Sequence, residues 1–148
     1  MQSTEKRWLL RSLEDTIELG EQIPKKFPDS KILILQGPLG AGKTSLVKGI
    51  AKTLGIHDPI TSPTFTLSQH YQEGIPPLIH LDLYRLENPK SADEFFLQEE
   101  EEANAIGALM VIEWPERLNI DITDALRIEL KYLHNGHRLA ELFLPNKL

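Results

Sequence analysis

The pattern of apolar and polar positions along the chain predicts an α/β fold. Three short segments, Ile32–Leu35, Leu78–Leu83 and Ala108–Glu113, are apolar at most positions. Such segments are typical of central strands in a parallel sheet, because helices on both faces bury both sets of side chains. Two other segments, Ser12–Phe27 and Leu46–Leu54, have apolar residues at helical spacing and are predicted to be helices that cover the sheet.

The ends of the predicted helices have suitable capping residues. Ser12 can cap the first helix, with Asp15 at the capping-box position. Gly55 lies just past the apolar stripe of the second helix, where a glycine commonly ends a helix. A third, acidic helix is expected from about Ser91 to Asn104. We expect Glu99–Glu102 to form its solvated face, with docking of a partner as the alternative.

The end of the chain is predicted to form an antiparallel hairpin. Apolar and polar residues alternate in Leu126–Tyr132, Asn135-Gly136 is a tight-turn signal, and Arg138–Leu144 returns as a second strand. Segment 56–77 is rich in turn formers and leaves room for only a short strand near Thr66–Tyr71. The prediction is one α/β domain over residues 1–148, with a mostly parallel sheet flanked by helices and a C-terminal antiparallel hairpin.

Composition limits the classes of protein that fit this chain. The 148 residues are 41% hydrophobic and 26% charged, which suits one domain with an ordinary core. There is no cysteine, no sign of a signal peptide, and no apolar run of the roughly 20 residues that a membrane helix needs. We therefore expect a soluble, cytoplasmic protein.

The distribution of charge argues against a protein that binds nucleic acid by itself. The net charge is −6, and Lys and Arg are missing between Lys52 and Arg85 and between Lys90 and Arg117. Binding of nucleic acid is driven largely by such cations on phosphate groups. If RNA takes part in the protein's work, we expect a basic partner to hold it.

Residues Gly37–Thr44 read GPLGAGKT and fit the pattern G-x-x-x-x-G-K-[ST]. In this pattern backbone N–H groups surround phosphate groups, the lysine reaches the β and γ oxygens, and the hydroxyl ligates magnesium. A buried strand directly before the loop and an amphipathic helix directly after it are the context that makes the pattern specific. We predict a P-loop NTPase-like fold in which Lys43 and Thr44 have these two roles.

Two acidic residues end predicted strands of the sheet. Asp82 ends LIHLD and Glu113 ends ALMVIE, and carboxylates at such ends point into the crevice where ligands bind in open α/β sheets. A phosphate loop needs an acid of this kind for its magnesium shell. His80 shares the strand face of Asp82, and both a structural and a catalytic role are open for it. Arg85 fits either a γ-phosphate contact or a salt bridge.

Four motifs in this order resemble those of the TsaE (YjeE) family: GPLGAGKT, SPTFTL at 62–67, HLDLYRL at 80–86 and IEWPE at 112–116. The resemblance covers nearly the whole chain. Members of the family are small bacterial P-loop ATPases required for making N6-threonylcarbamoyladenosine at position 37 of certain tRNAs. They work with TsaB and TsaD, so the resemblance implies these partners, with tRNA bound indirectly through their complex.

The resemblance also implies roles for individual residues, with ATP and Mg²⁺ as cofactors. The residues expected to bind the phosphates are Gly37, Gly40, Ala41, Gly42, Lys43, Thr44 and Ser45. Thr44 and Glu113 would ligate Mg²⁺, and Asp82 would be an acid required for hydrolysis. Thr64 lies in a segment that behaves as a switch loop in the family and would sense the γ-phosphate, while Thr16 would lie near the adenine. The catalytic candidates are Lys43, Asp82, Glu113 and Thr64.

The chain departs from the family pattern at two places. Pro38 stands where members often have Asp, a position whose side chain points outward, so phosphate binding should survive. The acidic stretch EFFLQEEEE at 94–102 stands where many members have a Leu-Gly pair. The second departure concerns the contacts with partners rather than the nucleotide site.

Two other classes of protein remain open. A small-molecule kinase would also use a phosphate loop and magnesium, but the stretches without Lys or Arg lie where an arginine-rich lid and a cationic acceptor site should be. A nucleotide-dependent binding module, in which ATP only switches the SPTFT segment, is the other alternative. No Asn-Lys-x-Asp motif for guanine is present, which favours ATP over GTP.

Overall fold

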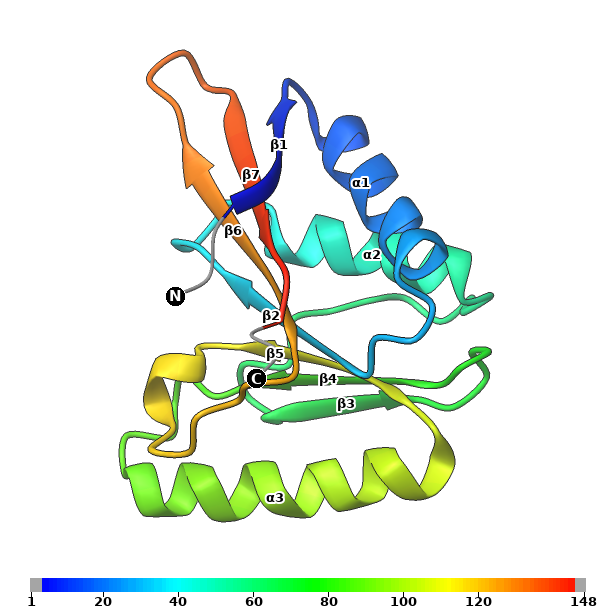
Figure 1. The fold of residues 1–148 in the computed structure, drawn as a ribbon, viewed down its shortest axis with the longest axis vertical. Coiled ribbons are helices and arrows are strands. Elements are labelled where there is room, and N and C mark those ends of the chain that lie inside the picture. The colour runs from blue at the N-terminus through cyan, green and yellow to red at the C-terminus, as the bar shows by residue number, and fades with distance from the viewer. Residues whose placement is uncertain (1–3, 146–148) are drawn as a thin grey trace.

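The computed structural model describes residues 4–145, which form seven strands, three α-helices and one short 3₁₀ helix. The strands are β1 (Thr4–Leu10), β2 (Ile32–Gln36), β3 (Ser68–Tyr71), β4 (Leu78–Asp82), β5 (Leu109–Glu113), β6 (Leu126–Tyr132) and β7 (Arg138–Phe143). The helices are α1 (Leu13–Lys26), α2 (Lys43–Thr53) and α3 (Pro89–Ile106), and the 3₁₀ helix spans Pro115–Arg117. Figure 1 shows α1 and α2 on one face of the sheet and α3 on the other.

All seven strands form one sheet in the order β1-β7-β6-β2-β5-β4-β3. Strands β6, β2, β5 and β4 run parallel, whereas β3, β7 and β1 are antiparallel to their neighbours. This confirms the predicted α/β fold with a parallel centre and a C-terminal hairpin. Because parallel strands end at the same edge of a sheet, Asp82, Glu113, Gln36 and Tyr132 all lie at one edge.

Alternation of side chains along the strands divides the core into two layers. Leu33 and Leu35 of β2 belong to a cluster that contains the buried hydrophobic residues of α1 and α2. Met110 and Ile112 of β5 belong to a second cluster, which contains Phe96 of α3. Because successive side chains of a strand point to opposite faces, the polar residues at the ends of β4 and β5 face α2.

Helices α1 and α2 cross at two glycines. A Cβ atom at Gly20 would overlap the carbonyl oxygen of Leu46, and one at Gly49 would overlap the carbonyl oxygen of Ile17. Only glycine allows two helix backbones to approach each other this closely. Helix α2, which follows the phosphate loop, is therefore interlocked with α1.

The predicted helix caps are confirmed. The N–H of Asp15 donates to Ser12 Oγ at 3.1 Å, and the N–H of Arg11 donates to the carboxylate of Asp15 at 2.9 Å. Gly55 has a φ of 78°, in the left-handed region, just after α2. Both ends are thus fixed by local chemistry that can be recognised in the sequence.

Three details of the sheet and helices differ from the expectations. Strand β1 has no counterpart among the predicted elements; it is an edge strand that pairs only with β7. Helix α3 begins at Pro89 rather than near Ser91, because Asn88 caps it by accepting the N–H of Lys90 at 2.9 Å. The expectation that Glu99 lies on the solvated face of α3 is wrong.

Glu99 points toward the sheet instead of toward solvent. It is only 9% exposed, and one of its carboxylate oxygens lies 3.2 Å from Nε2 of His70 on β3. Glu99 shares the buried face of α3 with Ala92, Phe96 and Ala103, which recur at helical spacing. The residues that follow, Glu100–Glu102, are more exposed, as expected.

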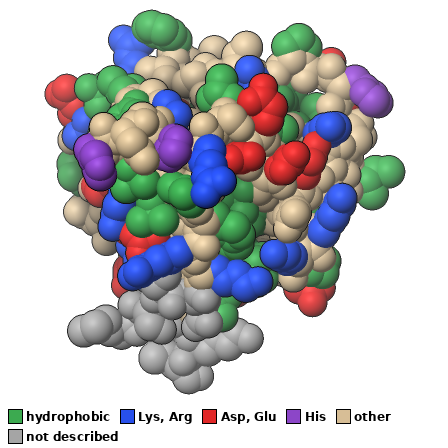
Figure 2. Space-filling model, turned by 90° about the horizontal axis from the view of Figure 1, so that it is seen from above, with side chains coloured by type: hydrophobic (Ala, Val, Ile, Leu, Met, Phe, Trp, Pro, Cys, Tyr) green, Lys and Arg blue, Asp and Glu red, His purple; other side chains and the backbone are tan. Residues whose placement is uncertain are grey.

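No helix in residues 4–145 is both long and apolar enough to cross a membrane. Figure 2 shows acidic and basic side chains interspersed over one face of the molecule. Neither sign of charge dominates that face, although the chain as a whole has a net charge of −6.

Candidate phosphate-binding site

The loop Gly37–Gly42 joins β2 to α2 at the edge where the parallel strands end. Within it the N–H of Ala41 donates to the carbonyl of Pro38 at 3.1 Å, closing a turn in which Gly40 has a φ of 77°. Gly42, with a φ of 106°, precedes the first residue of α2. The N–H groups at the start of a helix lack partners within the helix, so this end of α2 is suited to an anion.

Lys43 is the buried cation of the loop. Its side chain is 8% exposed, and its Nζ donates to the carbonyl of Gly37 at 2.6 Å. The same Nζ lies 3.6 Å from Oε1 of Glu113 and 5.2 Å from the centre of the Trp114 ring. The lysine of the loop and one of the two predicted acids are therefore direct neighbours.

Glu113 is held from its other side by His80. Both residues are buried, and Nε2 of His80 lies 2.6 Å from Oε2 of Glu113. A carboxylate only accepts hydrogen bonds, so we assign the proton to Nε2, which makes His80 the donor. Nδ1 of His80 has no partner among residues 4–145. The hydrogen-bonding role that the sequence left open for His80 is confirmed, and each oxygen of Glu113 has its own partner.

Asp82 connects β4 to the segment 62–67. Its Oδ2 accepts the hydroxyl of Thr64 at 2.9 Å, and its Oδ1 accepts the N–H of Tyr84 at 3.0 Å. The backbone N–H of Asp82 also donates to the carbonyl of Leu67 at 2.9 Å. Asp82 pairs with Glu113 across β4 and β5. The two acids and Thr64 therefore lie at one place, as the predicted site requires.

The backbone is strained next to both acids. Leu67 and Trp114 have φ values of 69° and 62°, in a region that costs a bulky residue about 1–3 kcal/mol. Leu67 closes the 62–67 segment, with its N–H bonded to the carbonyl of Pro63 at 2.7 Å. Trp114 follows Glu113 directly, and its ring packs on that of Tyr84 at 4.8 Å. Surrounding contacts hold both residues in these conformations.

Arg85 and Thr16, the two less certain candidates for contact with the nucleotide, lie in different places. The guanidinium of Arg85 lies over the ring of Phe65, 5.0 Å from its centre, and this ring is 83% exposed. Thr16 is buried in α1 beside the loop, so that a Cβ atom on Gly42 would be 3.5 Å from its Cγ2. Thr16 thus lies at the phosphate loop, whereas Arg85 lies on the 62–67 segment.

The sequence did not predict that residues of β6 and β7 contact the phosphate loop. The hydroxyl of Tyr132 donates to the carbonyl of Leu39 at 2.7 Å, and Nη2 of Arg138 donates to the carbonyl of Gly40 at 3.0 Å. The turn signal Asn135-Gly136 shows only that the residues on either side of it lie at a hairpin tip. Their contact with the loop depends on the strand order, which no local pattern reveals.

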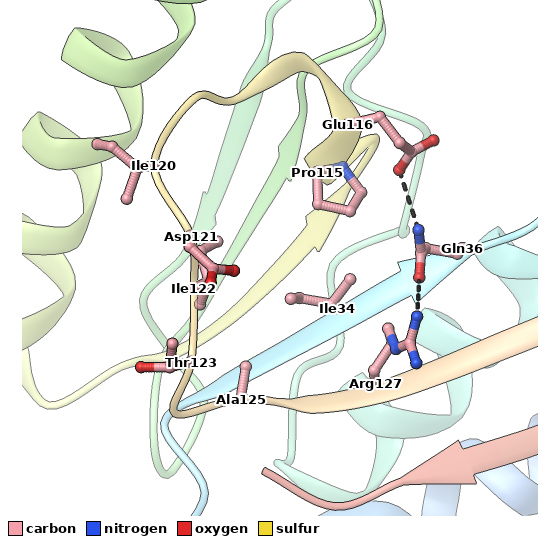
Figure 3. A pocket seen from close by; sticks show the side chains of 10 residues that line it. All are labelled: Ile34, Gln36, Pro115, Glu116, Ile120, Asp121, Ile122, Thr123, Ala125 and Arg127. Carbon is pink, nitrogen blue, oxygen red and sulfur yellow. Dashed lines mark hydrogen bonds between the residues drawn. The ribbon is translucent and has the colours of Figure 1, made fainter. Parts of the chain in front are cut away.

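A pocket of about 460 Å³ lies beside the end of β2, under the segment 115–125 (Figure 3). At its edge Nε2 of Gln36 donates to Glu116 at 3.1 Å, and Nη1 of Arg127 donates to Oε1 of Gln36 at 3.3 Å. Gln36 directly precedes the loop, so this chain of side chains fixes the point at which the loop begins. The pocket itself is lined by none of the loop residues.

The oxygen donors near the loop fit a hard cation that is also bound by phosphate. Within residues 4–145 no three His, Asp or Glu side chains gather into a metal site of their own. Thr44 in the first turn of α2 and the carboxylates of Asp82 and Glu113 offer the oxygen ligands that Mg²⁺ prefers. Magnesium usually takes only one or two such protein ligands together with phosphate oxygens and water.

The fold and the site together define an α/β protein of the P-loop NTPase-like class. A model of the family described as "Threonylcarbamoyl adenosine biosynthesis protein TsaE" matches residues 10–140. The chain therefore belongs to the TsaE family, which confirms the resemblance seen in its motifs.

Individual relatives agree with this assignment over most of their length. The chain is 41% identical over 134 residues to the tRNA threonylcarbamoyladenosine biosynthesis protein TsaE of Nostoc sp., covering 90% of this chain and 82% of that protein. It is 39% identical to the protein of the same name from Treponema pallidum, covering 89% and 96%. The crystal structure of Bacillus subtilis YdiB matches with a TM-score of 0.72 at 28% identity, covering 99% of this chain and 88% of that one.

Proposed function

We propose that the protein binds ATP and Mg²⁺ at the phosphate loop and hydrolyses ATP as a subunit of the cytoplasmic machinery for tRNA N6-threonylcarbamoyladenosine. In this proposal it acts with TsaD and TsaB and meets tRNA only through their complex. The observation that supports it most directly is the contact of Lys43 with Glu113 beside the GPLGAGKT loop, in a chain of the TsaE family.

The residues of the loop fit a nucleoside triphosphate. The N–H groups of the loop and of the first turn of α2, with Ser45, would hold phosphate oxygens. Lys43 would exchange its hydrogen bond with the carbonyl of Gly37 for one with a phosphate oxygen. Thr16, buried against Gly42, would border the nucleoside.

The two acids would have different tasks. Thr44 and Glu113 would ligate Mg²⁺, which when bound neutralises charge on the β and γ phosphates. His80 would keep Glu113 oriented through Oε2 while Oε1 of Glu113 exchanges Lys43 for the metal ion. Asp82 would orient the attacking water, and its hydrogen bond with Thr64 would link that task to the 62–67 segment.

The experiment that tests the proposal is ATP hydrolysis with Mg²⁺, measured for the protein alone and then with TsaB, TsaD and tRNA from the same source. We expect slow turnover alone and faster turnover with the partners. Transfer of phosphate to a small acceptor would instead identify a kinase. Nucleotide-dependent binding to the partners without hydrolysis would identify a binding module and contradict the enzymatic part of the proposal.

A further inference from the structure

Three carbonyl groups of the phosphate loop accept hydrogen bonds from side chains. The carbonyl of Gly37 is bound by Lys43, a residue of the loop motif itself. The carbonyls of Leu39 and Gly40 are bound by Tyr132 and Arg138, at 2.7 Å and 3.0 Å, and neither donor belongs to any recognised motif. The tip of the β6–β7 hairpin therefore supplies two of the three contacts.

Tyr132 and Arg138 form one unit. They are paired across the last rung of the hairpin, and the guanidinium lies 5.3 Å from the centre of the Tyr132 ring. The loop also lies close against this unit, because a Cβ atom on Gly40 would be 2.6 Å from the Tyr132 hydroxyl. The φ of 77° favours glycine at this position, and any side chain there would also have to displace the Tyr132 hydroxyl.

These two contacts fix the direction of the peptide groups in the loop. In a trans peptide the carbonyl of one residue and the N–H of the next point in opposite directions. Holding the carbonyls of Leu39 and Gly40 against the hairpin therefore turns the N–H groups of Gly40 and Ala41 to the inner side of the loop. The N–H of Ala41 donates to the carbonyl of Pro38, so it bonds within the loop and not to the hairpin. An anion-binding loop needs this orientation of its N–H groups.

Arg138 extends farther along the loop than this one contact. A Cβ atom on Gly42 would be 3.7 Å from Cδ of Arg138 and 3.5 Å from Cγ2 of Thr16, so the two side chains flank the start of α2. Nε of Arg138 is buried and has no hydrogen-bond partner among residues 4–145. The hairpin therefore places a cation beside the loop from Gly40 to Gly42.

We propose that Tyr132 and Arg138 are positioning residues of the nucleotide site: the tip of the β6–β7 hairpin preforms the phosphate loop and so sets the affinity for nucleotide. This inference rests on the proposed function for the identity of the ligand. It adds a part of the chain that lies outside the four family motifs to the nucleotide site.

The test measures the affinity for a fluorescent ADP analogue with Mg²⁺ in two variants and a matched control. Tyr132→Phe removes only the hydroxyl, and Arg138→Met removes the guanidinium but keeps an unbranched apolar chain. Lys131→Met is the control, because Lys131 lies on the same hairpin and binds Glu141 instead of the loop. We expect each test variant to bind about fivefold more weakly, the factor for one hydrogen bond of about 1 kcal/mol. The control should bind like the parent.

Two further readouts separate positioning from general loosening of the hairpin. Arg138→Lys keeps a cationic donor and should recover part of the lost affinity. In hydrolysis assays the KM for ATP should rise more than kcat falls, because a disordered loop loses contacts to the ground state and the transition state alike. Thermal unfolding of all variants verifies that they are folded.

The outcomes distinguish this inference from the function on which it rests. If Lys43→Ala loses affinity while Tyr132→Phe and Arg138→Met bind like the parent or like Lys131→Met, the inference is wrong and the proposed function stands. If Lys43→Ala itself binds like the parent, the nucleotide site is misplaced and both are wrong. Weaker binding in both test variants, with an unaffected control, supports the inference.

Discussion

The two sides of the phosphate loop differ in how deeply their residues are buried and in which groups of the loop they contact. On the side of β4 and β5, three polar residues are almost completely buried: His80, Asp82 and Glu113 are 0%, 4% and 4% exposed. On the side of β6 and β7, Tyr132 is 49% exposed and Arg138 is half-buried. The first side contacts the charged end of Lys43, and the second contacts neutral carbonyl groups.

This difference separates two requirements of a phosphate-binding loop. Charged groups that take part in chemistry need fixed geometry and little water, since burial strengthens their interactions and makes misplacement costly. The backbone of the loop needs only to keep its N–H groups pointing inward, which an exposed hairpin can achieve with two hydrogen bonds. Mutations on the two sides should therefore change different measurable quantities.

The largest effect is expected from Lys43→Ala, which removes the cation that contacts the acidic side. We expect the affinity for ATP to fall by at least about a hundredfold, because the β and γ phosphates lose their main side-chain partner. Calorimetric titration with ATP and Mg²⁺ measures this, with Lys48→Ala on the exposed side of α2 as the matched control. Equal affinities in the two variants would show that the site is wrongly assigned.

Glu113→Gln and Asp82→Asn should separate hydrolysis from binding. We expect either variant to retain nucleotide but to hydrolyse it roughly a hundredfold more slowly, as is typical when a group that positions a proton or a metal is lost. Single-turnover hydrolysis measures the rate of hydrolysis, and a binding titration on the same sample measures the affinity for nucleotide. Hydrolysis at the parent rate in both variants would remove these residues from the mechanism.

His80→Leu should show how much the buried side depends on its hydrogen bonds. The change leaves Oε2 of Glu113 buried without its donor, so we expect the free energy of unfolding to fall by about 1–3 kcal/mol. His80→Gln keeps an N–H donor and should lose less. Urea unfolding of both variants, with Tyr132→Phe for the exposed side, tests the comparison. If His80→Leu is no less stable than His80→Gln, the hydrogen bond from His80 to Glu113 does not stabilise the buried side.

The smallest effect is expected at Glu73, outside both sides of the loop. The backbone N–H groups of His57 and Asp58 donate to this carboxylate at 2.6 Å and 3.0 Å and lower its pKa below the usual value of 4.5. A lowered pKa stabilises the fold above the unfolded pKa, and this contribution disappears as pH falls through the folded pKa. The parent should therefore be slightly more stable than Glu73→Gln at neutral pH, and thermal unfolding should show the difference shrinking below about pH 4.5. A difference in stability between the parent and Glu73→Gln that stays constant across this pH range would contradict the lowered pKa of Glu73.

The parts of the fold that were predicted correctly are those determined by neighbouring residues. The strand Ile32–Gln36, the glycine loop and α2 follow one another directly, so their spacing alone brings the motif together. The acids at the ends of β4 and β5 were also predicted correctly, because the direction of a parallel strand determines where its last residue lies.

What was missed depends on contacts between distant parts of the chain. Arg138 and Gly40 are 98 residues apart, and they meet only because β6 pairs with β2. Strand β1 has a single neighbour, so pairing with β7 rather than its own pattern determines its structure. The spacing of Ala92, Phe96 and Ala103 places Glu99 on the buried face of α3, but its partner His70 comes from β3. None of these partners can be derived from local periodicity.

The close crossing of α1 and α2 limits how the molecule can move. Because a carbonyl oxygen of each helix lies where a glycine of the other has no side chain, neither helix can slide along its axis without a steric clash. A piston-like shift of α2 is thus not available as a response to a ligand at its N-terminus. A change at the phosphate loop is therefore expected to act first on the side chains that contact it directly, Glu113 at the end of β5 through Lys43, and Tyr132 and Arg138 at the hairpin tip.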